Sequence, residues 1–445
     1  MSASTSRDEA VLPGRAGRRE PGAGRGIRLV CAEAALAAAA FAALCTVVLS
    51  VAPQLGVEPD DGAYRASIVA MTQGDFLTLS TAQAETLARK LGDNPAAPPN
   101  QWVELPGGRT ISEKNPGYPF LAAPFQALGI IRWAPLFYGA LACLGLFAGA
   151  RRWLGRFGGP AAVGLYCSSG AALLFAWRDY MPTFTGASLI AAGSGILLWA
   201  LLATEASPRR RTRAGLAGFA AIEIATFVRY TDIVILGCAV VAVIVAWRRR
   251  GARLPLRTLC WWLASVAVFG ASVAIFDDLV YGGPLSSGYR FATGPSQVTF
   301  GLGAIGPNLR YLPAHLIQAM PMLVLGLAAL AWIIARAVTL RRPGAESPAG
   351  RDLWAGLALA ASWLAVWGVY SAYYWTNDPS EDTLQTVRFY VPAIGVISLL
   401  GAWLVTRIPG RAWLAGLTSA AVVAAMFVLG AWSFHAMVAG IGGIR

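Results

Sequence analysis

The run of residues 27–51, IRLVCAEAALAAAAFAALCTVVLSV, decides the fold class of this chain. A helix of ~20 apolar residues is enough to cross the ~30 Å hydrocarbon core of a bilayer, and this run is longer. It is also longer than the apolar core of a signal peptide, and no small-residue cleavage site with a soluble domain follows it. We therefore predict a signal anchor that forms the first transmembrane helix.

The composition of the whole chain is that of a membrane protein. Of 445 residues, 56% are hydrophobic and 13% are charged, whereas soluble domains carry about 25% charged residues. A net charge of +13 could indicate nucleic-acid binding. However, the basic residues fall in short clusters between apolar runs and form no continuous basic face. We therefore predict that the partners include the lipid bilayer but no nucleic acid.

Further apolar runs of roughly spanning length follow the first one. They predict an all-α, polytopic integral membrane protein with about eleven transmembrane helices. Among them, the run at 214–229 is the weakest, because it is short and contains Glu223. The runs lie at residues 133–150, 158–177, 183–203, 214–229, 231–247, 257–280, 314–338, 353–375, 388–406 and 412–435.

The distribution of Lys and Arg predicts the orientation of these spans. With the N-terminus in the cytoplasm, alternation places about 24 of the 36 basic residues on the inside. We predict a disordered cytoplasmic tail over 1–26, rich in Gly, Arg, Ser and Pro, and one transmembrane domain over 27–445. The Ala-, Gly- and Arg-rich composition suggests a GC-rich bacterial genome, and hence the plasma membrane of a bacterium.

Three connections on the predicted outer side are long: residues 52–132, 281–313 and 376–388. Functional residues concentrate in loops held by a rigid scaffold, so we expect the active face to be extracytoplasmic. In the first of these loops, apolar residues at helical spacing over 64–71 and 81–91 predict short interfacial helices. Residues 119–131 predict a re-entrant or interfacial helix, because they are apolar but too few to span.

The six cysteines show neither CxxC spacing nor any other metal-ligand spacing. They lie in or beside apolar runs, which favours small buried hydrophobic residues over a disulfide framework. We predict no metal site and no cofactor.

Two adjacent carboxylates, Asp60 and Asp61, lie just beyond the outer end of the first predicted span. Partial burial and mutual repulsion would raise the pKa of one of them toward neutrality, as a general base requires. The alternative is a pair of solvated loop residues. Their position at the membrane surface, beside Tyr64 and Arg65, makes the catalytic interpretation about as strong as the alternative.

A second motif, EKNPGYP at residues 113–119, places Glu113 and Lys114 before a rigid Pro/Gly turn. A lysine held there can bind a phosphate as a point charge, although Lys is also a common interfacial anchor. Arg178 and Asp179 end the third predicted span. Charges so near the hydrocarbon usually face a protein interior, and a local Arg–Asp pair is the simpler interpretation.

The remaining candidates lie at the outer ends of later spans. Arg229 falls between two spans with almost no loop, and Arg388 opens the span at 388–406. Tyr289 and Arg290 end the Gly- and Pro-rich loop YGGPLSSGYR at 281–290, where they could stack against a sugar or bind a phosphate. These polar groups share one depth, as an enzyme acting on a lipid phosphate headgroup would need. Transporters instead place their sites near the midplane.

Together these motifs resemble the GT-C membrane glycosyltransferases. The similarity is greatest to glycosyltransferase family 39 and RgtA/B/C/D-like enzymes, which include protein O-mannosyltransferases and the lipid A aminoarabinose transferase. It runs from about residue 52 to 400, although each motif is short and degenerate. The resemblance implies a polyprenyl-phosphate sugar donor and inversion at the anomeric carbon. The implied acceptor is a cell-envelope glycan, a glycolipid or a protein.

The resemblance also implies roles for individual residues. Asp60 matches the first-loop acid that acts as general base, with Asp61 beside it, and Glu113 and Lys114 match the pair near the donor phosphate. Asp179 matches an acidic residue of the second loop. Weaker matches, as phosphate or substrate contacts, are Arg229, Arg290 and Arg388.

Two departures from the family pattern stand out. The turn has Glu-Lys-Asn-Pro-Gly where the aminoarabinose type tends toward Glu-Lys-Pro-Pro, and the first-loop pair is Asp-Asp rather than Asp-Glu. A lipid-linked-sugar flippase or small-solute transporter is the main alternative. A glycan ligase or polymerase that uses outer-loop arginines is a third.

Overall fold

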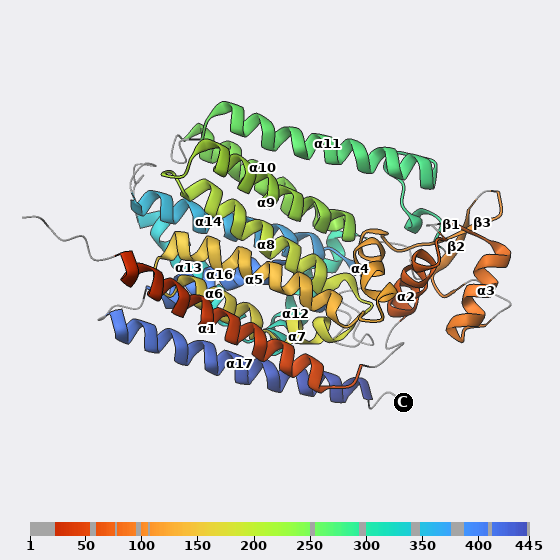
Figure 1. Cartoon of the computed structure of the whole chain (residues 1–445), viewed down its shortest axis with the longest axis horizontal. Coiled ribbons are helices and arrows are strands. Elements are labelled where there is room, and N and C mark those ends of the chain that lie inside the picture. The colour runs from red at the N-terminus through yellow and green to blue at the C-terminus, as the bar shows by residue number, and fades with distance from the viewer. Residues whose placement is uncertain are drawn as a thin grey trace, which may run out of the picture.

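The computed structural model describes residues 23–53, 59–75, 78–94, 99–105, 107–249, 254–292, 300–339, 348–374, 387–407 and 412–442. These residues form a bundle of long helices with a small cap of short helices and strands at one end (Figure 1). The predicted tail therefore falls largely outside the described residues, as does most of the connection at 376–388. The first helix begins at Ala23, about one turn before the start predicted at Ile27.

Within the described residues, seven helices are long and apolar enough to cross a membrane, or nine if each of two bent pairs counts as one span. The predicted polytopic, all-α membrane protein is confirmed, but the count of about eleven is not. Two more helices lie in the bundle: α9 (Pro208–Val228), which has arginines in its first turns, and α16 (Ile394–Val405), which has only 12 residues. The seven are α1 (Ala23–Ser50), α5 (Trp133–Leu154), α8 (Pro182–Leu202), α10 (Ile233–Arg248), α11 (Leu256–Tyr281), α14 (Pro348–Ser371) and α17 (Ala412–Gly442).

Two predicted spans are broken rather than continuous. The run at 314–338 divides into α12 (Ile305–Ala319) and α13 (Leu323–Thr339), which together with the 3-10 turn at Leu302–Ala304 bend by 118°. The break falls at Met320, whose φ of −133° and ψ of 72° are not helical. Pro321 follows it, and a residue before proline avoids the α conformation. The run predicted as a span at 314–338 is therefore not one continuous helix.

The second break divides residues 158–177 into α6 (Gly158–Cys167) and α7 (Gly170–Trp177), with a bend of 60°. Ser169 caps α7, because its hydroxyl accepts a hydrogen bond from the Ala172 backbone N–H at 3.3 Å. A Cβ on Gly430 of α17 would lie 1.7 Å from the Ser168 carbonyl oxygen. Glycine therefore allows α17 to pack directly on this break.

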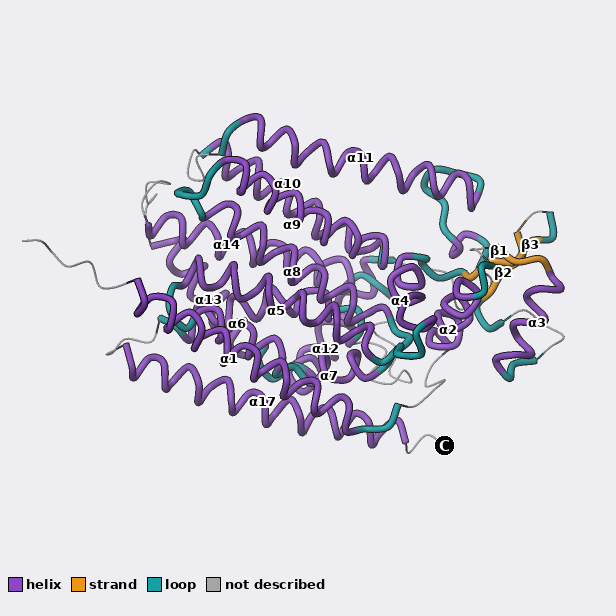
Figure 2. The backbone as a smooth tube through the Cα atoms, in the orientation of Figure 1, coloured by secondary structure: helices purple, strands orange, loops and turns teal. Residues whose placement is uncertain are grey.

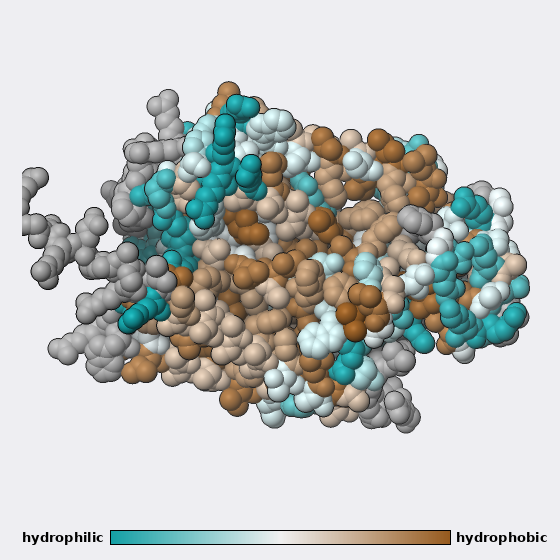
Figure 3. Space-filling view, in the orientation of Figure 1, coloured by the Kyte–Doolittle hydropathy of each residue, from teal (hydrophilic) through white to brown (hydrophobic). Residues whose placement is uncertain are grey.

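Small residues hold the centre of the bundle together. Gly145 and Gly149 of α5 face Ala192 and Gly195 of α8, and a Cβ on Gly149 would lie 2.3 Å from the Gly195 carbonyl oxygen. In lipid, close packing of this kind stabilises helix pairs, since the surrounding chains are as apolar as the helices. The burial of the helices is consistent with this central position of α8: 72% of its most apolar 18-residue segment is buried inside the protein, whereas the value for α11 is 11%. Figure 3 shows hydrophobic residues across the middle of the bundle and hydrophilic ones at its two ends.

The cap is built from the loop that follows α1. The predicted helices at 64–71 and 81–91 are present as parts of α2 (Pro59–Thr72) and α3 (Thr81–Leu91), and α4 (Gly117–Ala127) covers most of 119–131. An unpredicted antiparallel sheet joins them in the order β1-β3-β2 (Figure 2). Its strands of three and four residues are too short for a clear alternation of polar and apolar positions. They are β1 (Thr78–Ser80), β2 (Trp102–Leu105) and β3 (Arg109–Ser112).

Candidate active site

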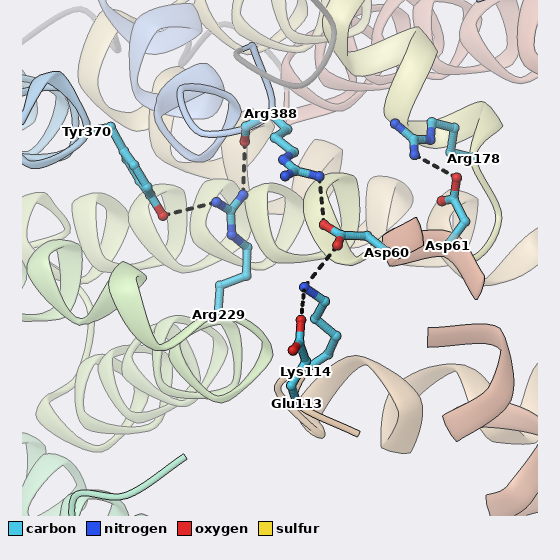
Figure 4. Close-up of polar contacts among 8 residues, drawn as sticks. All are labelled: Asp60, Asp61, Glu113, Lys114, Arg178, Arg229, Tyr370 and Arg388. Atoms are coloured by element: carbon cyan, nitrogen blue, oxygen red, sulfur yellow. Dashed lines mark hydrogen bonds and ion pairs between the residues drawn. The ribbon is translucent and has the colours of Figure 1, made fainter. Parts of the chain in front are cut away.

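The candidate site lies where the cap meets the bundle, and Asp60 is at its centre. Asp60 is in the first turn of α2, where the helix dipole favours a carboxylate. Its Oδ1 lies 2.9 Å from the Nζ of Lys114, and its Oδ2 lies 2.6 Å from the Nη1 of Arg388 (Figure 4). A residue of the first loop and one near the C-terminal end of the chain thus hold the same carboxylate from two sides.

Asp61 points to a different partner. Successive residues of a helix are rotated by about 100°, so neighbouring side chains cannot both face one group. The Oδ2 of Asp61 lies 2.6 Å from the Nη2 of Arg178, which directly follows α7 (Figure 4). This ion pair is more deeply buried than the Asp60 cluster: Arg178 is 1% exposed and Asp61 8%, against 15% for Arg388 and 17% for Asp60.

The electrostatics of Asp60 differ from the prediction. Burial opposes its ionisation, but the positive charges of Arg388 and Lys114 hold the pKa of the carboxyl well below its usual range. A hydrogen bond from Gln101 acts in the same direction. The predicted increase in pKa from repulsion with Asp61 is therefore wrong for Asp60 in this structure. The physical reason is that Asp60 faces two cations, whereas Asp61 is paired separately with Arg178.

Lys114 is held by its neighbours on three sides. One residue, Glu113, separates Lys114 from the end of β3. The Nζ of Lys114 lies 3.0 Å from the Oε1 of Glu113 and 5.1 Å from the centre of the Tyr289 ring. Burial favours the neutral amine, but Tyr289, Asp60 and Glu113 raise the pKa of Lys114 above its usual value. Lys114 is therefore a buried cation at neutral pH.

The loop at 281–290 reaches Lys114 through a close backbone contact. A Cβ on Gly288, in the 3-10 turn Gly288–Arg290, would lie 2.5 Å from the Cα of Glu113. Only glycine allows this approach, which places Tyr289 against Lys114. Arg290 instead donates a hydrogen bond to the Oγ of Ser286, 2.9 Å away in its own loop.

Arg229 and Arg388 form one basic region. Arg229 directly follows α9; its Nη1 donates to the Arg388 carbonyl oxygen at 2.9 Å, and its Nη2 donates to the Tyr370 hydroxyl at 3.0 Å (Figure 4). Phe389 packs beneath both guanidinium groups, at 6.0 Å from Arg229 and 4.9 Å from Arg388. Together with Lys114, the site holds three cations beside the carboxylates of Asp60 and Glu113, a suitable arrangement for an anionic phosphate.

Asp179 lies on the Asp61 side of the site. Burial raises the pKa of its carboxyl to about 6; Arg132 partly offsets this effect, and Asp61 adds to it. Its backbone carbonyl accepts a hydrogen bond from the Tyr118 hydroxyl. The simple interpretation of Arg178 and Asp179 as a local pair does not hold, since Arg178 pairs with Asp61.

Arg229 and Asp232 are close in sequence, and a local Arg–Asp pair is the simplest expectation for them too, but they form no hydrogen bond with each other. Within the described part of the chain, both carboxylate oxygens of Asp232 are buried and accept no hydrogen bond. Arg229 uses its two Nη atoms on Arg388 and Tyr370 instead.

The structure thus brings together six of the predicted residues, Asp60, Glu113, Lys114, Arg229, Tyr289 and Arg388. Asp61, Arg178 and Asp179 lie beside them, and Arg290 faces its own loop. Sequence reasoning missed Tyr370, because an aromatic residue near the end of an apolar run carries no signal of a polar partner. Among the residues that the structure describes, no three His, Cys, Asp or Glu side chains are grouped as metal ligands.

Comparison with known proteins supports the fold. No protein-family model and no curated protein matched the chain. Among solved structures, ArnT from Cupriavidus metallidurans bound to undecaprenyl phosphate aligns with a TM-score of 0.53 and 17% identity, over 95% of this chain and 71% of that one. The apo oligosaccharyltransferase of Archaeoglobus fulgidus aligns with a TM-score of 0.52 and 10% identity, over 90% of this chain and 56% of that one.

This chain therefore spans a little over half of the archaeal enzyme and most of ArnT. Both neighbours are GT-C proteins, and the resemblance read from the sequence is confirmed at the level of architecture. The chain has the fold of the GT-C membrane glycosyltransferases.

Proposed function

We propose that this protein is a membrane glycosyltransferase that moves a sugar from a polyprenyl-phosphate donor to an acceptor outside the cytoplasm. The observation that carries the proposal is the single carboxylate of Asp60 between Lys114 and Arg388, with Arg229 behind them. One base and several cations are what transfer from a sugar phosphate needs. The location proposed from the sequence is the plasma membrane of a bacterium, with the N-terminus in the cytoplasm.

The residues divide into two chemical roles. Asp60 removes the proton of the acceptor hydroxyl, which requires an oxygen-to-oxygen distance of about 2.6–3.2 Å. The acceptor oxygen then bonds to the anomeric carbon as the bond to the phosphate oxygen breaks on the opposite face, so the configuration inverts. Lys114, Arg229 and Arg388 offset the charge that develops on the departing polyprenyl phosphate.

The cation pairing of Asp60 connects donor binding to the activity of the base. With its carboxylate bound by Lys114 and Arg388, Asp60 is a weak base. A donor phosphate competes for the same two cations and draws positive charge away from the carboxylate. The pKa of Asp60 then rises, so the base becomes effective only when donor is present.

The neighbours in fold support the lipid carrier. The structure of ArnT contains undecaprenyl phosphate. We assign the same class of carrier here because cations surround the candidate base at the junction of bundle and cap. The acceptor, whether glycan, glycolipid or protein, would meet the donor at Asp60, and the sugar would lie near Tyr289.

The test is transfer of radiolabelled sugar from polyprenyl-phosphate donors in membranes that contain either the wild type or Asp60→Asn. We expect label to enter a glycan or glycolipid with the wild type and not with the variant. Asp93→Asn is the matched control, because Asp93 is an exposed carboxylate of the same cap. Transfer that survives Asp60→Asn would move the base to another residue, Asp61 first. Movement of intact donor across the bilayer without transfer would favour a flippase instead.

A further inference from the structure

A large cavity lies within the bundle, away from the candidate active site. It has a volume of about 570 Å³ and lies between α8, α10 and α14. Cavities that bind small molecules measure about 300–1,000 Å³. Along α10 its lining runs from Ile235 to Arg249, a length of about 21 Å at 1.5 Å per residue. The cavity is therefore long and narrow and runs parallel to the helices.

The walls of the cavity are almost wholly apolar. Buried side chains of three helices line it, among them Leu198, Val243 and Leu359. Of the two hydroxyl groups in the wall, that of Ser362 donates to the Leu359 carbonyl oxygen at 2.9 Å and is satisfied. A lining of this kind suits a hydrocarbon chain better than a polar solute.

The end of the cavity opposite Asp60 is basic. Arg249, which follows α10, and Arg351, in the first turn of α14, both line it. Arg249 lies over the ring of Trp354 at 5.2 Å, and the Nε of Arg351 is buried and hydrogen-bonds to nothing within the described part of the chain. The positive end of the α14 dipole adds to the same field.

A nearby carboxylate, Asp352, does not neutralise these arginines. Its Oδ2 lies 2.6 Å from the Nη2 of Arg407 and 4.0 Å from the Nη1 of Arg336, and its Oδ1 accepts a hydrogen bond from Trp403. Asp352 therefore serves other partners, and a positive charge remains at the mouth of an apolar cavity.

We infer that this cavity is a binding site for an anionic phospholipid, whose phosphate headgroup contacts Arg249 and Arg351 and whose acyl chain fills the space between α8, α10 and α14. Basic pockets between membrane helices bind anionic headgroups in this way. The inference does not depend on the proposed transferase activity. In this arrangement the lipid completes the packing of α10, of which only 28% of the most apolar window is buried.

The experiment is native mass spectrometry of the delipidated full-length protein, titrated with dioleoylphosphatidylglycerol or with dioleoylphosphatidylcholine, which has the same acyl chains. We expect the anionic lipid to bind more tightly. Because a basic residue near an anionic headgroup contributes about 1 kcal/mol, Arg249→Gln with Arg351→Gln should weaken that binding about 30-fold. Binding of the zwitterionic lipid should change little.

Arg257→Gln is the matched control, since Arg257 is exposed at the same end of the bundle and does not line the cavity. Its affinity should stay within about twofold of the wild type. A second variant, Ala242→Phe with Ala358→Phe, fills the cavity and should remove the preference for the anionic lipid while the thermal transition persists.

Three outcomes would overturn the inference. The first is equal binding of the two lipids by the wild type, and the second is an equal loss of affinity in Arg257→Gln. The third is displacement of the phosphatidylglycerol by undecaprenyl phosphate in the wild type but not in Lys114→Ala. That last result would show that the cavity holds the tail of the donor.

Discussion

The two carboxylates that begin α2 are adjacent in sequence but lie in different environments. Asp60 contacts Lys114 and Arg388, and neither of these residues belongs to the helices at the centre of the bundle. The side chain of Asp60 is 17% exposed. Asp61 contacts Arg178, which is 1% exposed, in a pair buried between α2 and the end of α7. The more exposed carboxylate, Asp60, suits catalysis, whereas the sealed ion pair of Asp61 suits the docking of the cap. We therefore propose a chemical role for Asp60 and a structural role for Asp61, and the first three predictions below test that division.

The largest expected effect is on the base. Asp60→Asn keeps the shape of the side chain but removes proton acceptance, and loss of a general base typically lowers the rate 10²–10⁴-fold. We expect kcat to fall in that range while donor binding persists, as measured by radiolabel transfer and by retention of donor on the purified protein. Loss of donor binding with the same substitution would contradict a role limited to the base.

The cations should come next. Arg388→Ala and Lys114→Ala remove groups that stabilise charge on the leaving phosphate, and removal of such a group costs about 10²–10³-fold in kcat. Single-turnover kinetics with saturating donor would separate this loss from weaker binding. The control is Arg290→Ala, because Arg290 hydrogen-bonds within its own loop. A loss as large in the control as in Arg388→Ala would mean that the loop, rather than the cation, is what matters.

Asp61→Asn should act on stability rather than on chemistry. It removes the negative charge from the buried Asp61–Arg178 ion pair, and breaking such a pair costs about 3–5 kcal/mol. A lower thermal transition in detergent, with near-normal transfer per folded molecule, is the expected result. Asp61→Asn combined with Arg178→Met should recover part of the stability. If Asp61→Asn instead abolishes transfer at unchanged stability, the roles assigned to the two carboxylates are reversed.

The smallest effect concerns pH. Burial raises the pKa of Asp179 to about 6 in the folded protein from 3.8 for a free side chain. Between these values the folded state binds more protons than the unfolded state, so this group favours folding at low pH and its contribution declines as pH rises through about 6. Thermal unfolding from pH 4.5 to 7 should show this decline in the wild type, and Asp179→Asn should show a flatter profile. An identical slope in both proteins would rule out Asp179 as its source.

Much of the architecture could be predicted because hydropathy is a local property. A run such as residues 27–51 is apolar whatever it packs against, so the membrane class and the approximate positions of the helices follow from the sequence. The helices at 64–71 and 81–91 could also be predicted, because the periodicity of each lies within its own segment. The strands of the cap could not, since three or four residues carry too little pattern and β3 needs two partners to form.

For the candidate site too, one part could be predicted from the sequence and another part could not. The sequence alone predicts that the chain carries carboxylates and cations at one depth. This follows from the residue types of Asp60, Lys114 and Arg388 and from their position at the outer ends of predicted spans. Only the tertiary structure decided which of them meet: Arg388 reaches Asp60 from 328 positions away, and Arg178 reaches Asp61 from 117 positions away. The ends of the apolar runs indicate which residues lie near the membrane surface. Ion pairs between distant segments depend on how the helices pack in three dimensions, and that packing is set by close contacts such as those between α5 and α8.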